Sequence, residues 1–493
     1  MIRRIFTAWM TEETLVEGDY QVILVGVIAL FTIFEILGLI SAYNALMSTR
    51  TSQGTIAWIL ALITWPVFAV PLYWIFGRSK FQGDVNARRI RDVRVAEIEK
   101  DLTEQVSSYR VNLGSVIGEA RALERLADLP FLRGNDVDLL VNGRETFDAM
   151  FAAIDEAEEY VACEFFIVHD DELGRQLKDR LIRKAKQGCN TFLLFDEVGS
   201  QGMTKTYLAD LAQAGVHVSR MNTNKGRHNR FQVNFRNHRK IVVVDGRVAF
   251  VGGHNVGDEY IGKHDRLTPW RDTHLKIEGP SVLGVQLAFA GDWHWATKSF
   301  PKLSWKTHVS KSADKIVFVL PSGPADDDET CGLFFMHAIN SAQRRIWIAS
   351  PYFVPDEGII DALKLAAMRG VDVRILIPGL ADKWFIKLAA LSYVEEVVAA
   401  GVKMYEYAPG FLHQKVVLID DSVSTIGTAN FDNRSFRLNF EISMVVIDRD
   451  FAKQVEAMLQ HDLSTSTLLE NVDRLSAMEV VGSRVARLCS PVL

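Results

Sequence analysis

The sequence predicts an α/β protein made of two similar halves, preceded by a two-helix transmembrane anchor. Three observations predict this fold. Two long apolar stretches lie near the N-terminus, at residues 22–40 and 55–76. Beyond them, predicted strands alternate with helices of ~10–15 residues, which is typical of a sheet covered by helices. The pattern His-x-Lys-x-x-x-x-Asp then occurs twice, once in each half.

Composition sets the broad class of the protein. With 493 residues the chain has room for two or three domains. Its net charge of -6 and isoelectric point near 6.1 argue against a protein that coats nucleic acid with positive charge. The four cysteines lack the spacing of metal ligands or of a disulfide framework, so reduced thiols in a cytoplasmic setting are the simplest interpretation.

The apolar stretches at 22–40 and 55–76 predict two transmembrane helices within an anchor over residues 1–76, because each reaches the ~20 residues that cross a bilayer. A cleaved signal peptide is the competing interpretation of the first stretch. That stretch is too long for one, acidic residues precede it, and a second stretch follows closely. Pro66 and Pro71 interrupt the second stretch, and membrane helices tolerate both.

Flanking charges predict the orientation of the anchor. Arg3 and Arg4 precede the first stretch, and the loop between the stretches holds only Arg50. A basic cluster follows the second stretch: Arg78, Lys80, Arg88, Arg89, Arg91 and Arg94. The positive-inside rule places both ends of this multi-pass protein, including its large C-terminal part, in the cytoplasm. Residues 77–125 are expected to form a helical connector.

Residues 126–310 and 311–493 form the two predicted halves, which share one order of elements. In the first half, a helix end, an apolar run, a helix and a strand lie at 152–157, 160–168, 172–186 and 191–195. Their counterparts in the second half lie at 336–342, 346–354, 356–368 and 371–377. Each half then supplies a strand pair, at 241–244 with 248–251 and at 416–419 with 424–426. The halves therefore represent an internal duplication.

The repeated motif supplies the candidate catalytic residues. The first copy contains His238, Lys240 and Asp245, and the second contains His413, Lys415 and Asp420. Each copy is followed by a Gly-x-x-Asn sequence that ends at Asn255 or Asn430. Side chains alternate along a strand, so each histidine and its lysine are expected to point the same way. Each pair thus places a nucleophile or base beside a fixed positive charge.

Two roles are open for the motif aspartates, Asp245 and Asp420. They are candidate catalytic residues because they belong to the repeated pattern. Each nevertheless follows its histidine by an odd number of residues and lies at a predicted turn, which favours hydrogen bonds to the backbone instead. Asp272 and Glu441, further along each half, are better placed to orient an imidazole. A surface salt bridge is the alternative for these two acids.

Two histidines, two lysines and two asparagines that converge on one point would suit a phosphodiester substrate. The lysines and the amides of Asn255 and Asn430 would neutralise charge on the non-bridging oxygens. One histidine would attack phosphorus, and the other would protonate the leaving alkoxide and later deprotonate the incoming alcohol. The scheme needs no metal or other cofactor, and the sequence has no carboxylate cluster of the two-metal type.

The duplicated motif with its trailing Gly-x-x-Asn resembles the signature of the phospholipase D superfamily. Further segments resemble bacterial cardiolipin synthases, namely NFRNHRK at 234–240, GDEY at 257–260, WRDTH at 270–274 and NRSFRLNFE at 433–441. The resemblance covers essentially the whole chain, including its end at 484–493. It implies two phospholipase D-like α/β/α units related by a pseudo-twofold, with one active site at their interface.

The resemblance also implies a reaction. One phosphatidylglycerol would donate its phosphatidyl group to His238, and the terminal hydroxyl of a second would collect it, giving cardiolipin and glycerol. His413 would be the acid and base. The expected partners are phosphatidylglycerol and anionic membrane lipids at the bacterial inner membrane.

Three other functions compete with this interpretation. A membrane-bound hydrolase, or a phosphatidyltransferase with a different acceptor, would use the same motifs. A non-catalytic lipid-binding protein predicts damage to at least one motif, whereas both are intact. A nuclease is disfavoured by the acidic charge and by the anchor, so no nucleic acid is expected as a partner.

Overall fold

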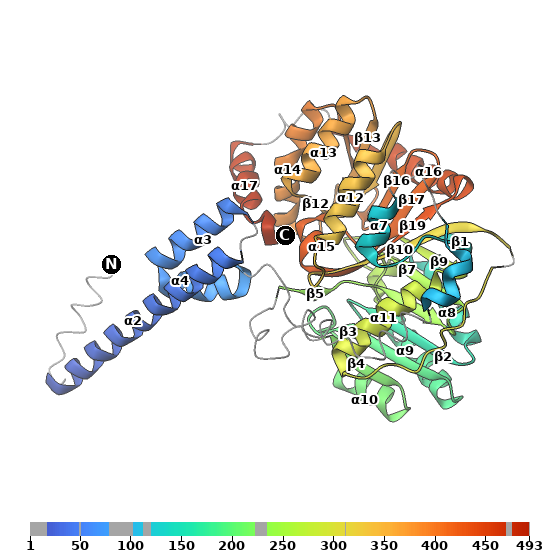
Figure 1. Cartoon of the computed structure of the whole chain (residues 1–493), viewed down its shortest axis with the longest axis horizontal. Coiled ribbons are helices and arrows are strands. Elements are labelled where there is room, and N and C mark those ends of the chain that lie inside the picture. The colour runs from blue at the N-terminus through green and yellow to red at the C-terminus, as the bar shows by residue number, and fades with distance from the viewer. Residues whose placement is uncertain are drawn as a thin grey trace. The chain divides into compact units, whose positions relative to one another are not determined.

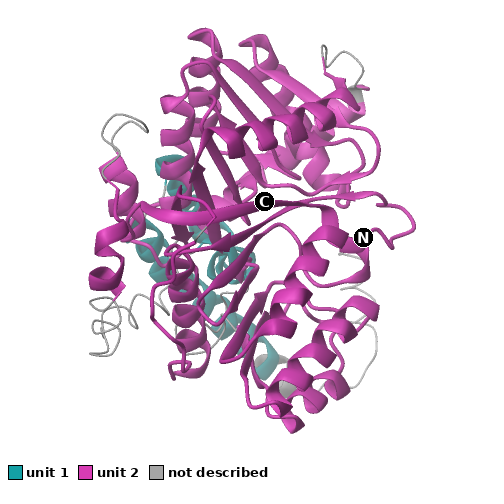
Figure 2. Ribbon diagram, turned by 90° about the vertical axis from the view of Figure 1, so that its right-hand side faces the viewer, with its two compact units in different colours: residues 1–81, 228–234 teal, residues 82–227, 235–493 magenta. Residues whose placement is uncertain are grey.

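The computed structural model describes residues 17–48, 51–77, 102–111, 120–221, 234–310, 312–469 and 476–492. The chain divides into two compact units, coloured separately in Figure 2. Unit 1 comprises residues 1–81 and 228–234, and unit 2 comprises residues 82–227 and 235–493. Most of the predicted connector, together with the arginines and the lysine used to predict orientation, lies outside the described residues.

The described part of unit 1 consists mainly of apolar helices. They are α2 (Glu17–Met47), α3 (Ser52–Thr64), α4 (Pro66–Leu72) and the π-helical turn η1 (Tyr73–Gly77). Residues 22–47 of α2 have a mean hydropathy of 2.7, and α2 continues past the predicted end at residue 40. Among the described residues, this is the one helix that is long and apolar enough to cross a membrane.

The second apolar stretch differs from the single helix predicted over residues 55–76. The chain leaves the helical conformation at Trp65, where φ is -136° and ψ is 58°. A proline disfavours helical geometry in the residue before it and has no N–H for the helix ladder, so Pro66 ends α3 and begins α4. The resulting segments pack against α2, where the Tyr73 hydroxyl donates a hydrogen bond to Asn44 at 2.8 Å.

Unit 2 contains both predicted halves, joined in one mixed sheet of 16 strands (Figure 1). Before the first half lie η2 (Ser107–Tyr109) and α7 (Ala120–Ala127). The first half contains β1 (Leu132–Val141), α8 (Asn142–Glu156), β2 (Tyr160–Phe165), α9 (Glu172–Lys186), β3 (Asn190–Asp196), α10 (Lys205–Gln213), β4 (His217–Met221), β5 (Arg236–Asn237), β6 (Ile241–Val244), β7 (Val248–Gly252), η3 (Asp258–Ile261), β8 (Trp270–Arg271), β9 (Thr273–Glu278) and α11 (Val282–Thr297).

The second half repeats this order. It contains β10 (Lys315–Ser322), α12 (Thr330–Ser341), β11 (Arg345–Ala349), β12 (Phe353–Val354), α13 (Glu357–Met368), β13 (Asp372–Pro378), α14 (Trp384–Ala399), β14 (Lys403–Tyr407), β15 (Phe411–Leu412), β16 (Val416–Ile419), β17 (Val423–Gly427), β18 (Phe431–Asp432), α15 (Asn433–Arg437), β19 (Asn439–Ile447) and α16 (Arg449–Ser464). The chain then adds β20 (Ser466–Leu468), α17 (Ala477–Arg487) and η4 (Ser490–Val492).

The strand order is equivalent in the two halves when it is read outward from the centre. β1 and β10 pair antiparallel in the middle of the sheet. From β1 the order is β9, β7, β6, β2, β3, β4, and from β10 it is β19, β17, β16, β11, β13, β14. The three outer strands are parallel in each half, and the others pair antiparallel. The duplication seen in the sequence is therefore also present in the topology.

The predicted helices and strands of each half are present. At the helices, the hydrophobic periodicity and the capping residues indicate the same boundaries. The helix predicted at 172–186 is α9, whose N-cap Asp171 accepts a hydrogen bond from the Gly174 N–H at 2.9 Å. Asp356 caps α13 in the same way at 2.9 Å. Each half buries its own apolar cluster between sheet and helices, around residues such as Leu177 and Leu363.

Candidate active site

Each motif histidine is held at the boundary between the halves by a strand of the opposite half. β5, just before His238, pairs with the start of β19, and the His238 N–H donates to the Phe440 carbonyl at 2.9 Å. β15, just before His413, pairs with β8, and the His413 N–H donates to the Arg271 carbonyl at 2.7 Å. The two short parallel pairings therefore bring the histidines from distant parts of the chain to one junction.

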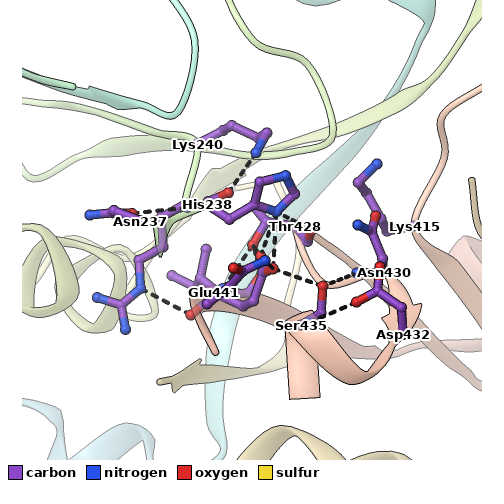
Figure 3. A network of polar contacts seen from close by, with 12 residues as sticks. Asn237, His238, Lys240, Lys415, Thr428, Asn430, Asp432, Ser435 and Glu441 are labelled. Carbon is purple, nitrogen blue, oxygen red and sulfur yellow. Dashed lines mark hydrogen bonds and ion pairs between the residues drawn. The ribbon is translucent and has the colours of Figure 1, made fainter. Parts of the chain in front are cut away.

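The carboxylate that orients each imidazole also comes from the opposite half. Nδ1 of His238 lies 3.0 Å from both carboxylate oxygens of Glu441, and Nδ1 of His413 lies 2.7 Å from Oδ2 of Asp272. Both carboxylates are completely buried. A carboxylate at Nδ1 keeps the proton on that nitrogen and leaves Nε2 free for attack or proton transfer. Figure 3 shows the His238–Glu441 contact and the lysines beside it.

Glu441 is fixed by three further hydrogen bonds. The hydroxyl groups of Thr428 and Ser435 donate to its oxygens at 2.6 and 2.9 Å (Figure 3). The Asn439 amide donates at 3.1 Å. Burial alone would raise the pKa of Glu441, but His238 and Lys240 beside it hold that pKa below its usual value. Glu441 is therefore ionised at neutral pH and can stabilise a positive charge on His238.

Asp272 occupies a space that exists only because residue 253 is glycine. A β-carbon at Gly253 would overlap the Asp272 carboxylate. The corresponding residue of the other half is Thr428, whose side chain hydrogen-bonds to Glu441 instead. The Asp272 carboxylate also accepts a hydrogen bond from the N–H of Thr273 at 2.8 Å. Gly253 thus determines where the carboxylate partner of His413 can lie.

We expect Gly253→Ala to lower kcat by about 100-fold, because a displacement of about 1 Å in a catalytic group can cost that much. The added methyl group pushes the Asp272 carboxylate away from His413. Steady-state assays of phosphodiester turnover provide the measurement. Gly332→Ala on α12 is the matched control, since its β-carbon would come no closer than 3.9 Å to another residue. Full kcat in the Gly253 variant would contradict this account of the site.

Lys240 and Lys415 occupy equivalent positions, although the His-x-Lys segments precede β6 and β16 and are not part of those strands. Each Nζ donates a 2.6 Å hydrogen bond to the carbonyl of its own histidine. Burial lowers the pKa of Lys240 to about 7 and that of Lys415 to about 8. Two ammonium groups this poorly solvated form a site that favours an anion.

The electrostatics indicate that the two motifs act on each other. Burial lowers the pKa of His238 to about 4, with Lys240 and Lys415 adding to the effect. Burial also lowers the pKa of His413 well below its usual value, with Lys415, Lys240 and His238 contributing. Charges from both halves therefore converge on both imidazoles, which are neutral at pH 7 and available as a nucleophile and a base.

The two motif asparagines have different surroundings. The Asn255 side chain accepts from the Ile167 N–H at 3.1 Å and donates to the Tyr260 hydroxyl at 2.8 Å. The Asn255 amide thus connects the backbone at Ile167 with the side chain of Tyr260. The buried Oδ1 of Asn430 has no hydrogen-bond partner among the described residues. An unpaired carbonyl oxygen is an acceptor and does not itself bind phosphate, so the prediction that both amides contact phosphate stays a prediction.

Asp245 and Asp420 lie at turns and bind backbone amides. Asp245 accepts hydrogen bonds from the N–H groups of Glu158, Glu159 and Tyr160 at 2.7–2.8 Å. Asp420 accepts from three consecutive N–H groups at the start of β11, at 343–345, with distances of 2.8–3.3 Å. Within the described parts of the chain, neither carboxylate hydrogen-bonds to a motif histidine. Of the two roles left open for these aspartates, the hydrogen bonds favour the structural one, in which each carboxylate joins a helix end to the strand that follows.

We expect Asp245→Ala to lower the free energy of unfolding by about 2–4 kcal/mol, since three backbone donors, of which that of Tyr160 is buried, lose a charged acceptor. Asp245→Asn is the matched control. It keeps an acceptor oxygen and tolerates the φ of 51° at this position, so its loss should be smaller. Thermal or denaturant unfolding of the purified proteins provides the measurement. An Asp245→Ala protein of unchanged stability but without turnover would instead support the catalytic role.

Several residues of the site were not predicted as site residues. Trp270, Phe411 and Tyr260 surround His413, with ring centroids 5.2, 5.8 and 6.2 Å from the imidazole. The Arg239 guanidinium donates to the Glu441 carbonyl at 2.9 Å and is ion-paired with Asp292 at 2.6 Å. Trp270 belongs to a segment that carried the family resemblance, whereas Asp292 lies on α11 in no recognised motif.

The fold and the site together define a class of protein. A duplicated α/β sheet that joins two carboxylate-oriented histidines and two buried lysines is the arrangement of phospholipase D-like enzymes. Comparison with known proteins agrees with this class. A family profile described as "Cardiolipin synthase, PLD-like domain" matches residues 150–266 and 335–463.

Relatives identify the family. The chain is 47% identical to cardiolipin synthase A of Pseudomonas putida strain KT2440, covering 94% of this chain and 97% of that protein. It is 46% identical to cardiolipin synthase A of Pseudomonas aeruginosa strain LESB58, covering 93% and 94%. The chain belongs to the cardiolipin synthase family of phosphatidyltransferases.

A solved structure supports the fold. The phosphatidylserine synthase of Haemophilus influenzae Rd KW20 aligns with a TM-score of 0.57 at 15% identity, covering 76% of this chain and 99% of that one. At this identity the likeness concerns the fold alone. The mixed α/β architecture of unit 2 is thus a known arrangement.

Proposed function

We propose that this protein makes cardiolipin by transferring a phosphatidyl group from one phosphatidylglycerol to another. The observation that carries the proposal is the reciprocal pairing of His238 with Glu441 and of His413 with Asp272. It supplies two oriented imidazoles beside two ammonium groups. Such a site can hold the phosphodiester of a lipid head group and exchange one glycerol oxygen for another.

In the first step, Nε2 of His238 attacks phosphorus and forms a P–N bond. The P–O bond to the head-group glycerol breaks, and His413 gives a proton to the leaving alkoxide. The free site lowers the pKa of His413, with burial as the main cause and the lysines next. A bound phosphodiester anion offsets the lysine charges, so we infer that the substrate itself raises the pKa of His413 and allows it to carry this proton.

In the second step, His413 takes the proton from the terminal hydroxyl of a second phosphatidylglycerol. That oxygen attacks phosphorus, the P–N bond to His238 breaks, and cardiolipin is released. The nucleophile is assigned to the N-terminal half because that is the usual pattern in the superfamily. Glu441, a buried carboxylate at Nδ1, can stabilise the positive charge of a phospho-histidine at His238, as Asp272 could at His413, so the choice between the two rests on the superfamily pattern.

We also propose the following arrangement for the whole chain. The equivalent strand orders support a pseudo-twofold relation between residues 126–310 and 311–493. The apolar helices over residues 1–76 form an anchor in the bacterial inner membrane, with the catalytic part in the cytoplasm. One span by α2 and a second by the broken stretch α3–α4 would return the chain to the side on which it began.

The direct test of function is to incubate the purified protein with phosphatidylglycerol as the sole lipid. Cardiolipin and glycerol in equal amounts are expected. Phosphatidic acid as the only lipid product would assign the protein to the hydrolases instead. A phosphatidyltransferase with another acceptor would form its product only when that acceptor is added.

The pH dependence of kcat/KM follows from the pKa values of the free site. Lys240 and Lys415 act as cations, so their contribution is complete below their pKa values and is lost as pH rises through about 7 and about 8. We therefore expect kcat/KM to fall on the alkaline side of neutrality, with His238 remaining neutral throughout. Initial rates over a pH range spanning both values provide the measurement. A flat profile would show that neither ammonium group is required for productive binding.

A further inference from the structure

Helix α17 and the turn after it carry a row of exposed apolar side chains. Met478, Val481, Val485 and Leu488 are 85%, 63%, 55% and 80% exposed. Their spacing places them on one face of the helix. Single exposed apolar residues are ordinary, but an aligned row of four marks an interaction surface.

The opposite face of α17 is firmly packed on α14. Ala486 is completely buried, and a β-carbon at Gly482 would lie 3.7 Å from the Leu388 side chain. The Arg487 guanidinium lies 4.2 Å from the ring centre of Tyr393 on α14. A capping box of Ser476 and Glu479 also closes the start of α17. The helix is therefore folded in place with its apolar row directed outward.

The beginning of α14 adds one exposed aromatic side chain, that of Trp384. Gly482 faces Leu388, while Arg487, further along α17, reaches Glu396, further along α14. The helices thus run in the same direction, so Met478 and Trp384, each one turn before the Gly482–Leu388 contact, lie at the same end of the pair. Trp384 is 72% exposed. We call Trp384, Met478, Val481, Val485 and Leu488 the apolar surface.

The Trp384 end of this surface is close to the active site. Asp382, two residues before Trp384, accepts a 2.6 Å hydrogen bond from the Tyr352 hydroxyl. The charge of Asp382 also acts on the pKa of Lys415, and that of Lys383 on the pKa of His413, in each case after the larger effect of burial. A molecule held at the Trp384 end would thus be near the reacting groups.

We propose that the apolar surface docks on the lipid bilayer and directs lipid head groups from there to the active site. This inference rests on the proposed function, in which donor and acceptor are both bilayer lipids. A tryptophan beside a row of aliphatic side chains is the composition that inserts at the boundary between head groups and acyl chains. A second protein is the less suitable occupant, because five side chains are far fewer than the ~20–30 residues per partner in a stable interface.

The basic residues of α17 are already paired with carboxylates, which favours an apolar over a charged binding partner for this surface. The Arg484 guanidinium lies 3.4 Å from the Glu395 carboxylate, and that of Arg487 lies 3.3 Å from Glu396. Their charges are balanced by the neighbouring helix. Docking is therefore expected to depend on acyl chains and to be insensitive to salt.

A fluorophore that responds to polarity tests the proposal in the full-length protein. It is attached at Val481→Cys in a Cys489→Ser background, since Cys163, Cys189 and Cys331 are buried. The protein is reconstituted into phosphatidylglycerol vesicles whose acyl chains carry bromine near the head group, which quenches only nearby fluorophores. Lys453→Cys on α16, with a side chain 72% exposed, is the matched control.

We expect quenching at position 481 to be several-fold greater than at position 453, and to fall to the control level when Met478→Ser and Val485→Ser are added. Equal quenching at both positions would overturn the proposal. Energy transfer between labelled chains in place of lipid quenching would also overturn it, and would assign the surface to a second copy. The readout needs no product, so a failure to make cardiolipin in the phosphatidylglycerol assay would count against the proposed function alone.

Discussion

Replacing His238 with alanine is expected to lower kcat by roughly 10⁴- to 10⁶-fold, the range for enzymes that lose their covalent nucleophile. Apart from His413, no imidazole among the described residues is held at this junction with a carboxylate at Nδ1 and an ammonium group beside it. Replacing His413 should cost less, about 10²- to 10⁴-fold, because it removes acid and base catalysis but leaves the nucleophile in place. Turnover of phosphatidylglycerol provides the measurement.

A donor lipid with a good leaving group separates the two roles. Phosphatidyl-p-nitrophenol needs no proton on its departing oxygen, so His413→Ala should still release a burst of p-nitrophenol and form a covalent adduct. His238→Ala should do neither. Radiolabelled phosphatidyl on the protein, acid-labile as expected for phospho-histidine, would locate the adduct. An adduct that persists in His238→Ala and disappears in His413→Ala would reverse the assignment.

The second large effect is expected for Glu441→Gln, which should lower kcat by about 10²- to 10⁴-fold with little change in KM. The amide has almost the same shape as the carboxylate, but Thr428 and Ser435 donate to different oxygens of Glu441, so the single amide oxygen keeps the acceptor of only one of them. It lacks the negative charge that stabilises a positive His238, and its NH₂ group can turn the imidazole to the wrong tautomer.

Asp272→Asn is the matched variant on the other histidine, and its comparison with Glu441→Gln tests the reciprocal arrangement. With the p-nitrophenyl donor, Asp272→Asn should keep its burst because Asp272 serves only His413, whereas Glu441→Gln should lose it. Rapid mixing of purified proteins provides both measurements. If Asp272→Asn abolished the burst and Glu441→Gln retained it, His413 and not His238 would be the nucleophile.

The helices and strands of the two halves could be predicted because capping residues, hydrophobic periodicity and turn residues indicate the same elements. The helix at 172–186 has an N-cap aspartate, a hydrophobic face and a following glycine, and α9 has the predicted boundaries. The motif histidines and lysines were identified from spacing alone, since duplication is a feature of the sequence itself. Asp272 and Glu441 were selected as carboxylate partners because each lies near the motif in its own half.

The pairing between halves could not be predicted from those signals. Asp272 bonds to His413 and Glu441 to His238, across 141 and 203 positions of the chain. That exchange depends on the short pairings β5–β19 and β15–β8, which are two residues long and leave no periodic pattern. The second apolar stretch was predicted as one helix because hydropathy carries no information on the non-helical backbone conformation of Trp65. The packing of α17 on α14 likewise has no motif.

The exchange of carboxylates between the halves also governs when the enzyme can first act during its own synthesis. Ribosomes deliver the N-terminal half first, and at that stage the nucleophile has no acid to hold its ring. The missing acid, Glu441, follows His238 by 203 residues and is translated correspondingly later. With His238 as the proposed nucleophile, a chain released before residue 441 is expected to be unable to transfer a phosphatidyl group.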